Sequence, residues 1–235
     1  MSQRFFISES IEAGQLELTG AEARHLGRVM RAQPGDTVIV FNGRGLESRA
    51  QVCQVEKNVV LLQLESPCSV DRERPDPLVL GVALPRGDRQ KWLVEKLVEL
   101  GAASLVPLVT ERGVAQPIEK ALDRLRRMVI EASKQCGRNQ LMEIETPGSL
   151  DDFCQAHADF PGRLIAHPDE TVATLDRSSL KAGSSQATAV AVGPEGGFSE
   201  AELQVASQYG WQQVSLGPRI LRVETAAVLL AALTG

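Results

Sequence analysis

The chain has 235 residues, of which 43% are hydrophobic and 23% are charged, and its formal net charge is −5 at pH 7. This length allows one large domain or two modest ones, and the composition is that of an ordinary globular protein. The acidic net charge argues against a protein that coats nucleic acid indiscriminately, although it is compatible with a local basic face. The longest apolar run, residues 226–233, is far below the ~18 residues that a membrane-spanning helix needs.

The cysteines of the chain show no pairing pattern. Cys53, Cys68, Cys136 and Cys154 lie far apart and form no CxxC pair, which argues against a zinc site and against a disulfide framework. We therefore expect reduced thiols, no bound metal and a cytoplasmic protein. The first six residues turn polar too quickly for a signal peptide, which fits this expectation.

The first 68 residues are predicted to form mainly short strands, rich in Val, Ile, Leu and Phe and separated by turn signals. One helix is expected over residues 21–31, where Leu26, Val29 and Met30 follow a helical period. These elements predict a small β-barrel domain over residues 1–68. The polar, proline-containing stretch 69–77 predicts a linker. The expected strands cover residues 4–8, 15–19, 37–41, 48–55 and 59–65.

From residue 78 to residue 235, predicted strands and helices alternate. The strands are apolar throughout, which predicts an α/β domain whose parallel sheet is covered on both faces. A capping box, Ser199-x-x-Glu202, and a stop at Gly210 delimit one of the helices. The expected strands are 78–84, 105–109, 163–166, 188–192 and 214–216, and the expected helices are 88–100, 118–135, 150–157, 199–209 and 224–233.

Two glycine-marked turns follow the strands near the C-terminus. The first reads GPEGGFS over residues 193–199, and the second reads LGPRILRVET over residues 216–225. The ends of parallel strands are where α/β proteins build ligand sites, so the pair predicts one binding pocket. The first turn is neither a P-loop, which needs Lys-Ser/Thr, nor a dinucleotide fingerprint, whose glycine spacing differs. The structural alternative is that both are simply tight strand-to-helix turns.

Charge is segregated along this acidic chain. Residues 86–138 hold eleven Lys or Arg residues against seven Asp or Glu residues. Such a segment is typical of a face that follows a nucleic-acid backbone, and equally of a solvated helix. For Arg124, Arg126 and Arg127 the two interpretations have equal weight.

The motifs of this chain resemble those of a known family. The pair GPEGGFS and LGPRILRVETA resembles the signature of the RsmE-type ribosomal RNA (uracil-N3) methyltransferases, members of the SPOUT superfamily. Further family-like motifs occur in order at residues 25–31 (HLGRVMR), 96–101 (KLVELG) and 131–138 (EASKQCGR). The resemblance therefore covers nearly the whole chain.

The resemblance implies a fold and an activity that periodicity could not predict. The implied fold is a SPOUT-like C-terminal domain with a deep trefoil knot, preceded by a PUA-like RNA-binding barrel. The implied activity is S-adenosylmethionine-dependent methylation of N3 of a uridine in 16S ribosomal RNA, by a homodimer. The RNA partner would be free rRNA or the assembled small subunit.

The resemblance and the two turns together imply candidate site residues. The candidates for catalysis are Arg222, Glu224 and Glu195, with neither glutamate favoured as the base. The candidates for cofactor binding are Ala166, His167, Gly193, Pro194, Glu195, Gly196, Leu216, Gly217, Ile220 and Leu221. The candidates for RNA binding are Arg4, Arg24, Arg28, Arg31, Arg86, Arg89, Lys91, Arg112, Lys134, Arg138 and Asn139.

Three other functions remain open from the sequence. The nearest is a SPOUT methyltransferase that acts on another RNA nucleotide, including one in tRNA. The second is a non-catalytic RNA-binding protein of ribosome assembly, against which the intact turns argue. The third is an enzyme for a small phosphorylated substrate, against which the missing P-loop lysine argues.

Overall fold

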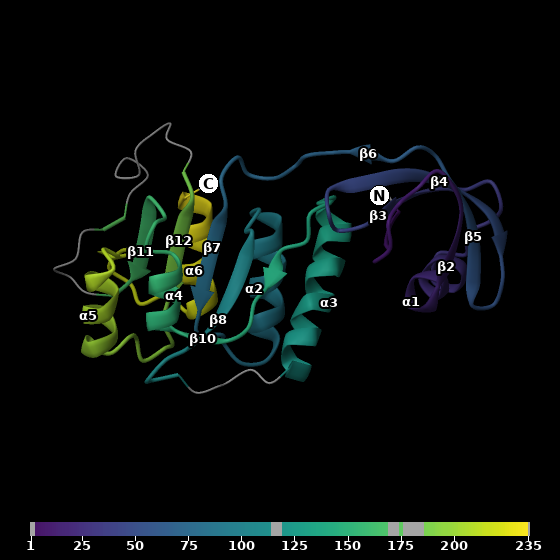
Figure 1. Cartoon of the computed structure of the whole chain (residues 1–235). Coiled ribbons are helices and arrows are strands. Elements are labelled where there is room, and N and C mark those ends of the chain that lie inside the picture. The colour runs from purple at the N-terminus through teal and green to yellow at the C-terminus, as the bar shows by residue number, and fades with distance from the viewer. Residues whose placement is uncertain (1–2, 114–118, 169–173, 176–185, 235) are drawn as a thin grey trace. The chain divides into compact units, whose positions relative to one another are not determined.

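The computed structural model describes residues 3–113, 119–168, 174–175 and 186–234. The chain divides into two compact units. The first contains residues 1–73 and 130–141, and the second contains residues 74–129 and 142–235. Figure 1 shows the helices and strands of both units.

The first unit is built on a six-stranded mixed sheet with the order β1-β3-β4-β5-β2, and β6 pairs with β4. Strand β1 runs parallel to β3, whereas the other neighbours are antiparallel. In β5, Val60, Leu62 and Leu64 alternate into the buried core, as the period of a strand requires. The strands are β1 (Arg4–Phe6), β2 (Gly14–Thr19), β3 (Thr37–Phe41), β4 (Leu46–Val55), β5 (Val59–Leu64) and β6 (Cys68–Ser69).

The helix of this unit differs from the expected continuous helix over residues 21–31. A short α1 (Gly20–Arg24) leads into a π-helical turn, His25–Val29. Its wider winding is visible in the backbone, where the Met30 N–H donates to the His25 carbonyl at 3.0 Å. Arg31, two residues after this turn, is a non-glycine residue with a φ of 56°. Leu26 points into the core, while Val29 is 70% exposed.

The second unit contains a seven-stranded sheet with the order β10-β8-β7-β12-β11-β13, and β9 pairs with β8. All of its strand pairs are parallel, which confirms the predicted parallel sheet. Every residue of β7 and β12 is buried, because parallel sheets are covered on both faces. The strands are β7 (Leu78–Val82), β8 (Ser104–Val109), β9 (Glu143–Ile144), β10 (Gly148–Ser149), β11 (Gly162–Ala166), β12 (Thr188–Val192) and β13 (Gln212–Val214).

The helices of the second unit pack in pairs. Helices α2 and α6 lie side by side, and α6 contacts β12 and β7 (Figure 1). Helices α4 and α5 contact each other and share a core with the sheet, in which Phe153 packs beside Ile165 and Trp211. The helices that lie wholly in this unit are α2 (Asp88–Glu99), α4 (Leu150–Ala156), α5 (Glu200–Gln208) and α6 (Val223–Leu233), whereas α3 (Glu119–Cys136) is divided, and its residues 130–136 belong to the first unit.

The predicted boundaries agree with these bounds to within two residues. Strand β13 begins two residues earlier than predicted and ends at Val214, while the predicted residues 215–216 already belong to the next loop. The short strands β6, β9 and β10 were not predicted, because two-residue strands carry no readable alternation. The predicted helix start at Ile118 lies outside the described residues.

Candidate active site

A pocket lies where β11 and β12 end and where the loop after β13 leads into α6. The space between its walls, counted out into open solvent, is about 580 Å³. Because the strands are parallel, their carboxyl ends meet at one edge of the sheet and bring these loops together. The lining residues are Ala166, His167, Pro168, Val192, Gly193, Pro194, Glu195, Gly197, Leu216, Gly217, Arg219, Ile220, Leu221, Val223 and Ala226.

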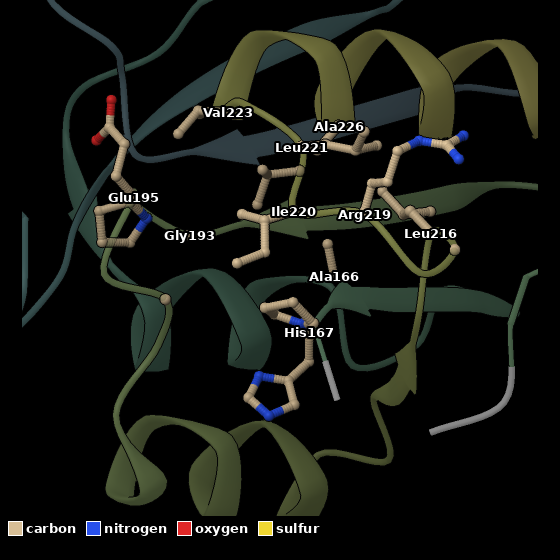
Figure 2. A pocket seen from close by; sticks show the side chains of 15 residues that line it. Ala166, His167, Gly193, Glu195, Leu216, Arg219, Ile220, Leu221, Val223 and Ala226 are labelled. Atoms are coloured by element: carbon tan, nitrogen blue, oxygen red, sulfur yellow. The ribbon is translucent and has the colours of Figure 1, made fainter. Parts of the chain in front are cut away.

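This pocket brings together most of the residues predicted to bind cofactor. Gly196 is the predicted residue that does not belong to the lining set. Figure 2 shows Ala166, Ile220 and Leu221 near the middle of the pocket, with Glu195 and Arg219 on opposite sides. Sequence reasoning missed the lining residues Pro168, Val192, Gly197, Arg219, Val223 and Ala226, which flank predicted ones.

The first glycine turn, residues 193–199, is shaped by close packing and by a helix cap. A Cβ on Gly193 would come within 3.1 Å of the buried Phe198 ring, so a side chain there would displace the ring or the turn. The Ser199 N–H donates to the Glu202 carboxylate at 2.8 Å, and the Ser199 hydroxyl accepts from the Glu202 N–H. This is the predicted capping box, and it fixes the start of α5.

Arg112, which follows β8, holds the same turn from outside. Its Nη1 donates to the carbonyl oxygens of Gly196 at 3.0 Å and Phe198 at 3.4 Å. The neighbouring Glu111 N–H donates to the Glu202 carboxylate at 3.0 Å. A residue predicted to contact RNA therefore contacts the backbone of the pocket turn in this structure.

The second turn, residues 216–225, leads from the end of β13 into the first residues of α6. Gly217 has a φ of 106°, a backbone conformation that side chains with a Cβ rarely adopt. Ile220 lines the pocket and is nevertheless 86% exposed. Arg222 is the N-cap residue of α6 and is exposed, whereas Glu224 lies buried in the first turn of that helix.

Two of the candidate catalytic residues lie close to the same arginine side chain. Arg89, in the first turn of α2, lies 3.1 Å from the Glu195 carboxylate and 3.6 Å from the Glu224 carboxylate. The structure thus brings together Glu195 and Glu224, which belong to different turns. Arg89 was predicted to contact RNA, and its role in this cluster was not predicted.

Within the first unit, three of the predicted RNA-binding residues are buried. Arg4 forms an ion pair with Glu47 at 3.0 Å and a hydrogen bond with Asn139, and Arg138 pairs with Glu73 at 2.9 Å. Asn139 also donates to the Val70 carbonyl. The burial of these side chains argues against RNA contact and instead indicates that they fasten residues 130–141 to the strands of this unit.

The pKa of Glu47 reflects this polar cluster. Burial alone would raise the pKa, but hydrogen bonds from Asn139 and Arg4 and the charges of Arg4 and Arg72 outweigh it and lower the pKa. Glu47 is therefore held as a carboxylate by its neighbours.

The other predicted RNA-binding residues are divided between exposed and paired positions. Arg24, Arg28 and Arg31 are exposed around the π-helical turn. Lys134 bonds Glu22 at 3.0 Å and Glu131 at 3.1 Å, so its charge is already balanced. In the second unit, Arg86 is exposed, and Lys91 is exposed and paired with Glu95 on its own helix.

The described residues contain neither a metal-binding cluster nor a membrane-spanning helix. Among them, no group of three or more His, Cys, Asp and Glu side chains could hold a metal ion. Within the same ranges, no helix is both long enough and apolar enough to cross a bilayer.

Comparison with known proteins identifies the family. The second unit and its pocket define the methyltransferase class, since residues 72–235 match the model of the RNA methyltransferase domain. Residues 18–65 match the RNA methyltransferase PUA domain. The chain belongs to the RNA methyltransferase family that contains ribosomal RNA small subunit methyltransferase E.

The relatives cover nearly the whole chain. Ribosomal RNA small subunit methyltransferase E of Bacillus subtilis is 31% identical over 95% of this chain and 92% of its own length. The Synechocystis protein of that name is 33% identical over 99% of this chain and 77% of its own length.

Solved structures agree with this assignment. A Legionella pneumophila methyltransferase with bound cofactor SAM is 33% identical, with a TM-score of 0.89 over 100% of this chain and 97% of that chain. The Neisseria gonorrhoeae ribosomal RNA small subunit methyltransferase E bound to S-adenosyl methionine is 30% identical, with a TM-score of 0.87 over 99% of this chain and 96% of that chain.

Proposed function

We propose that this protein transfers a methyl group from S-adenosylmethionine to N3 of a uridine in 16S ribosomal RNA. The observation that carries the proposal is the pocket formed by two glycine turns at the ends of parallel strands. The match to the RNA methyltransferase family and the two relatives named ribosomal RNA small subunit methyltransferase E also support the proposal.

The pocket residues fit S-adenosylmethionine. Its walls are mainly apolar side chains and backbone, suited to a flat adenine ring. At Gly217, which has a positive φ and open space around its missing Cβ, the backbone can approach a ligand closely, whereas the missing Cβ of Gly193 makes room for the Phe198 ring. Leu216, Ile220 and Leu221 would hold the adenine ring. When bound, the cofactor supplies an electrophilic methyl group on a positively charged sulfur.

The chain's own residues must then prepare the uracil. N3 of uracil carries a proton and becomes a good nucleophile only when that proton leaves or when charge on the neighbouring oxygens is stabilised. Arg222, exposed at the start of α6, is our candidate for stabilising that charge. Glu195 and Glu224 are the candidates for accepting the proton or orienting the ring, with neither preferred.

The target uridine must be unpaired, because N3 lies on its pairing edge. In the first unit, Val29 and Met30 are exposed at the π-helical turn and are accompanied by Arg24, Arg28 and Arg31. Apolar side chains that can pack on bases, flanked by arginines that can bind phosphates, fit single-stranded RNA. We assign the RNA contact of this unit to that turn, and that of the second unit to Arg86 and Lys91.

We infer a trefoil knot, a homodimer and a cytoplasmic site of action. The knot is supported by the path of the chain after β13, where the Leu175 N–H in the β11–β12 connection donates to the Ser215 carbonyl at 2.8 Å. Ser215, which follows β13 on the way to α6, thus lies beside residues 174–175 of that connection.

Methyl mapping on 16S rRNA tests the proposed function. Purified protein and S-adenosylmethionine are incubated with free 16S rRNA or with small subunits from a strain that lacks the protein, and the modified nucleotide is identified by mass spectrometry. We expect a single N3-methyluridine. A methyl group on another nucleotide would support the related-enzyme alternative, and calorimetry without any heat of cofactor binding would support a non-catalytic RNA-binding protein.

The Arg222→Ala variant tests the assigned role of Arg222. We expect methyl transfer to fall by well over threefold, which corresponds to more than about 0.7 kcal/mol of transition-state stabilisation. Methyl transfer and RNA affinity that both stay within about threefold of wild type would contradict the role.

A further inference from the structure

Arg89 occupies a position between two acidic side chains from separate loops. Its Nη1 lies 3.1 Å from Glu195 Oε1 and 3.6 Å from Glu224 Oε2. Glu195 belongs to the first glycine turn and lines the pocket, while Glu224 begins α6. One guanidinium on α2 therefore connects the two segments that form the pocket.

The burial of Glu224 makes this contact important. The Glu224 side chain is 8% exposed, and its Oε2 has no hydrogen-bond partner in the described part of the chain. A carboxylate taken out of water needs a nearby opposite charge, and removing that charge is strongly destabilising. Arg89 supplies the ion pair at this oxygen, so the position of Glu224 depends on it.

The same geometry argues against Arg89 as a contact for the RNA backbone. Arg89, Glu195 and Glu224 together carry one net negative charge, which repels a phosphate rather than attracting it. The Arg89 side chain is 37% exposed, so it is accessible, but it already contacts two carboxylates. Accessibility alone therefore does not make this arginine a phosphate-binding residue.

We propose that Arg89 is a positioning residue of the methyl-transfer site, and this inference rests on the proposed function. Arg89 fixes the carboxylates of Glu195 and Glu224 relative to each other at the pocket. The turn that carries Glu195 has its own backbone support from Arg112 and from the cap at Ser199. Loss of Arg89 therefore releases the two side chains and leaves the cofactor-binding backbone in place.

A double-mutant cycle in thermal stability tests the ion pair without any assay of activity. The proteins are wild type, Arg89→Gln, Glu224→Gln and the double variant. We expect Arg89→Gln to lower the unfolding midpoint, because Glu224 is left without its ion-pair partner. The double variant should be less destabilised than the sum of the single variants. Additive shifts would overturn the proposed Arg89–Glu224 pair.

Kinetics and RNA binding then separate positioning from phosphate contact. For Arg89→Gln we expect kcat to fall about tenfold or more, while the Kd values for S-adenosylmethionine and for 16S rRNA stay within about threefold of wild type. The salt dependence of RNA affinity should be unchanged. A wild-type kcat at saturating RNA, together with a salt slope reduced by about one, would show a phosphate contact and overturn the proposal.

Arg126→Gln provides a matched control. Arg126 also bridges two carboxylates, Glu119 at 2.8 Å and Asp123 at 3.0 Å, but all three lie on α3 and none lines the pocket. We expect its kcat to equal that of wild type. If wild type itself transfers no methyl group to rRNA, the proposed function fails, whereas the stability cycle still shows whether Arg89 and Glu224 are paired.

Discussion

Arg112 Nη1 donates a hydrogen bond to the carbonyl oxygen of Gly196 at 3.0 Å. The bond joins the segment after β8 to the first glycine turn, two parts of the chain 84 residues apart in sequence. The same nitrogen reaches the Phe198 carbonyl at 3.4 Å. Arg112 therefore restrains the backbone of the turn at Gly196 and at Phe198.

The first prediction concerns this restraint. In Arg112→Ala the turn loses this restraint, so cofactor binding must also order the backbone of the turn. We therefore expect the Kd for S-adenosylmethionine to rise about fivefold to tenfold. Isothermal titration calorimetry measures the change. Arg126→Ala should bind the cofactor as wild type does, because Arg126 is a half-buried arginine of α3 whose partners lie on its own helix. An unchanged Kd for Arg112→Ala would show that the turn is held without it.

The second prediction concerns the backbone of the other turn. Gly217 has open space around its missing Cβ, but its φ of 106° strains any L side chain. We expect Gly217→Ala to shift the turn and weaken cofactor binding about tenfold, the effect of ~1–2 kcal/mol of strain. Gly148→Ala is the control, because Gly148 also has open space and lacks a positive φ. Equal affinities of the two variants would contradict the strain argument.

The third prediction concerns the pH dependence of stability. The pKa of Glu47 is lowered in the folded state, so above the usual Glu pKa its charge stabilises the fold. This contribution is lost as the pH falls through the lowered pKa, because protonation then breaks the contacts with Arg4 and Asn139. Glu47→Gln should be destabilised at pH 7 by about 1–3 kcal/mol, the usual effect of losing charge-assisted hydrogen bonds.

Urea denaturation at pH values from 7 to below 4 checks this prediction. The difference in unfolding free energy between wild type and Glu47→Gln should shrink as the pH falls. Glu12→Gln, which replaces an exposed carboxylate, should show almost no difference at any pH. A difference for Glu47→Gln that stays constant with pH would contradict the assignment.

The fourth prediction concerns thiol reactivity. Burial, aided by the charge of Asp151, raises the pKa of Cys154 to about 12, so it holds almost no thiolate at pH 8. Cys53, Cys68 and Cys136 are exposed. A thiol reagent at pH 8 should label these three quickly and Cys154 only after unfolding, as peptide mass spectrometry would show. Early labelling of Cys154 would mean that α4 opens in the native protein.

Several features of this protein could be predicted because they depend on residues that are close together in the sequence. The alternation of apolar strands and helices gave the parallel sheet, since strands buried on both faces must be apolar throughout. The capping box was predictable because Ser199 and Glu202 are three residues apart. The pocket between the two turns followed from one rule, that parallel strands end at the same edge of their sheet.

Other features depend on contacts between residues that are distant in sequence. Nothing near Arg89 or Arg112 distinguishes it from a solvated arginine, because the partners lie more than eighty residues away. The same holds for Arg4, whose partner Asn139 is 135 residues distant. Sequence therefore determined the elements and the place of the pocket, because both follow from local patterns. Only the tertiary structure decided which arginines support the folded chain and which lie exposed, because that depends on contacts between distant residues.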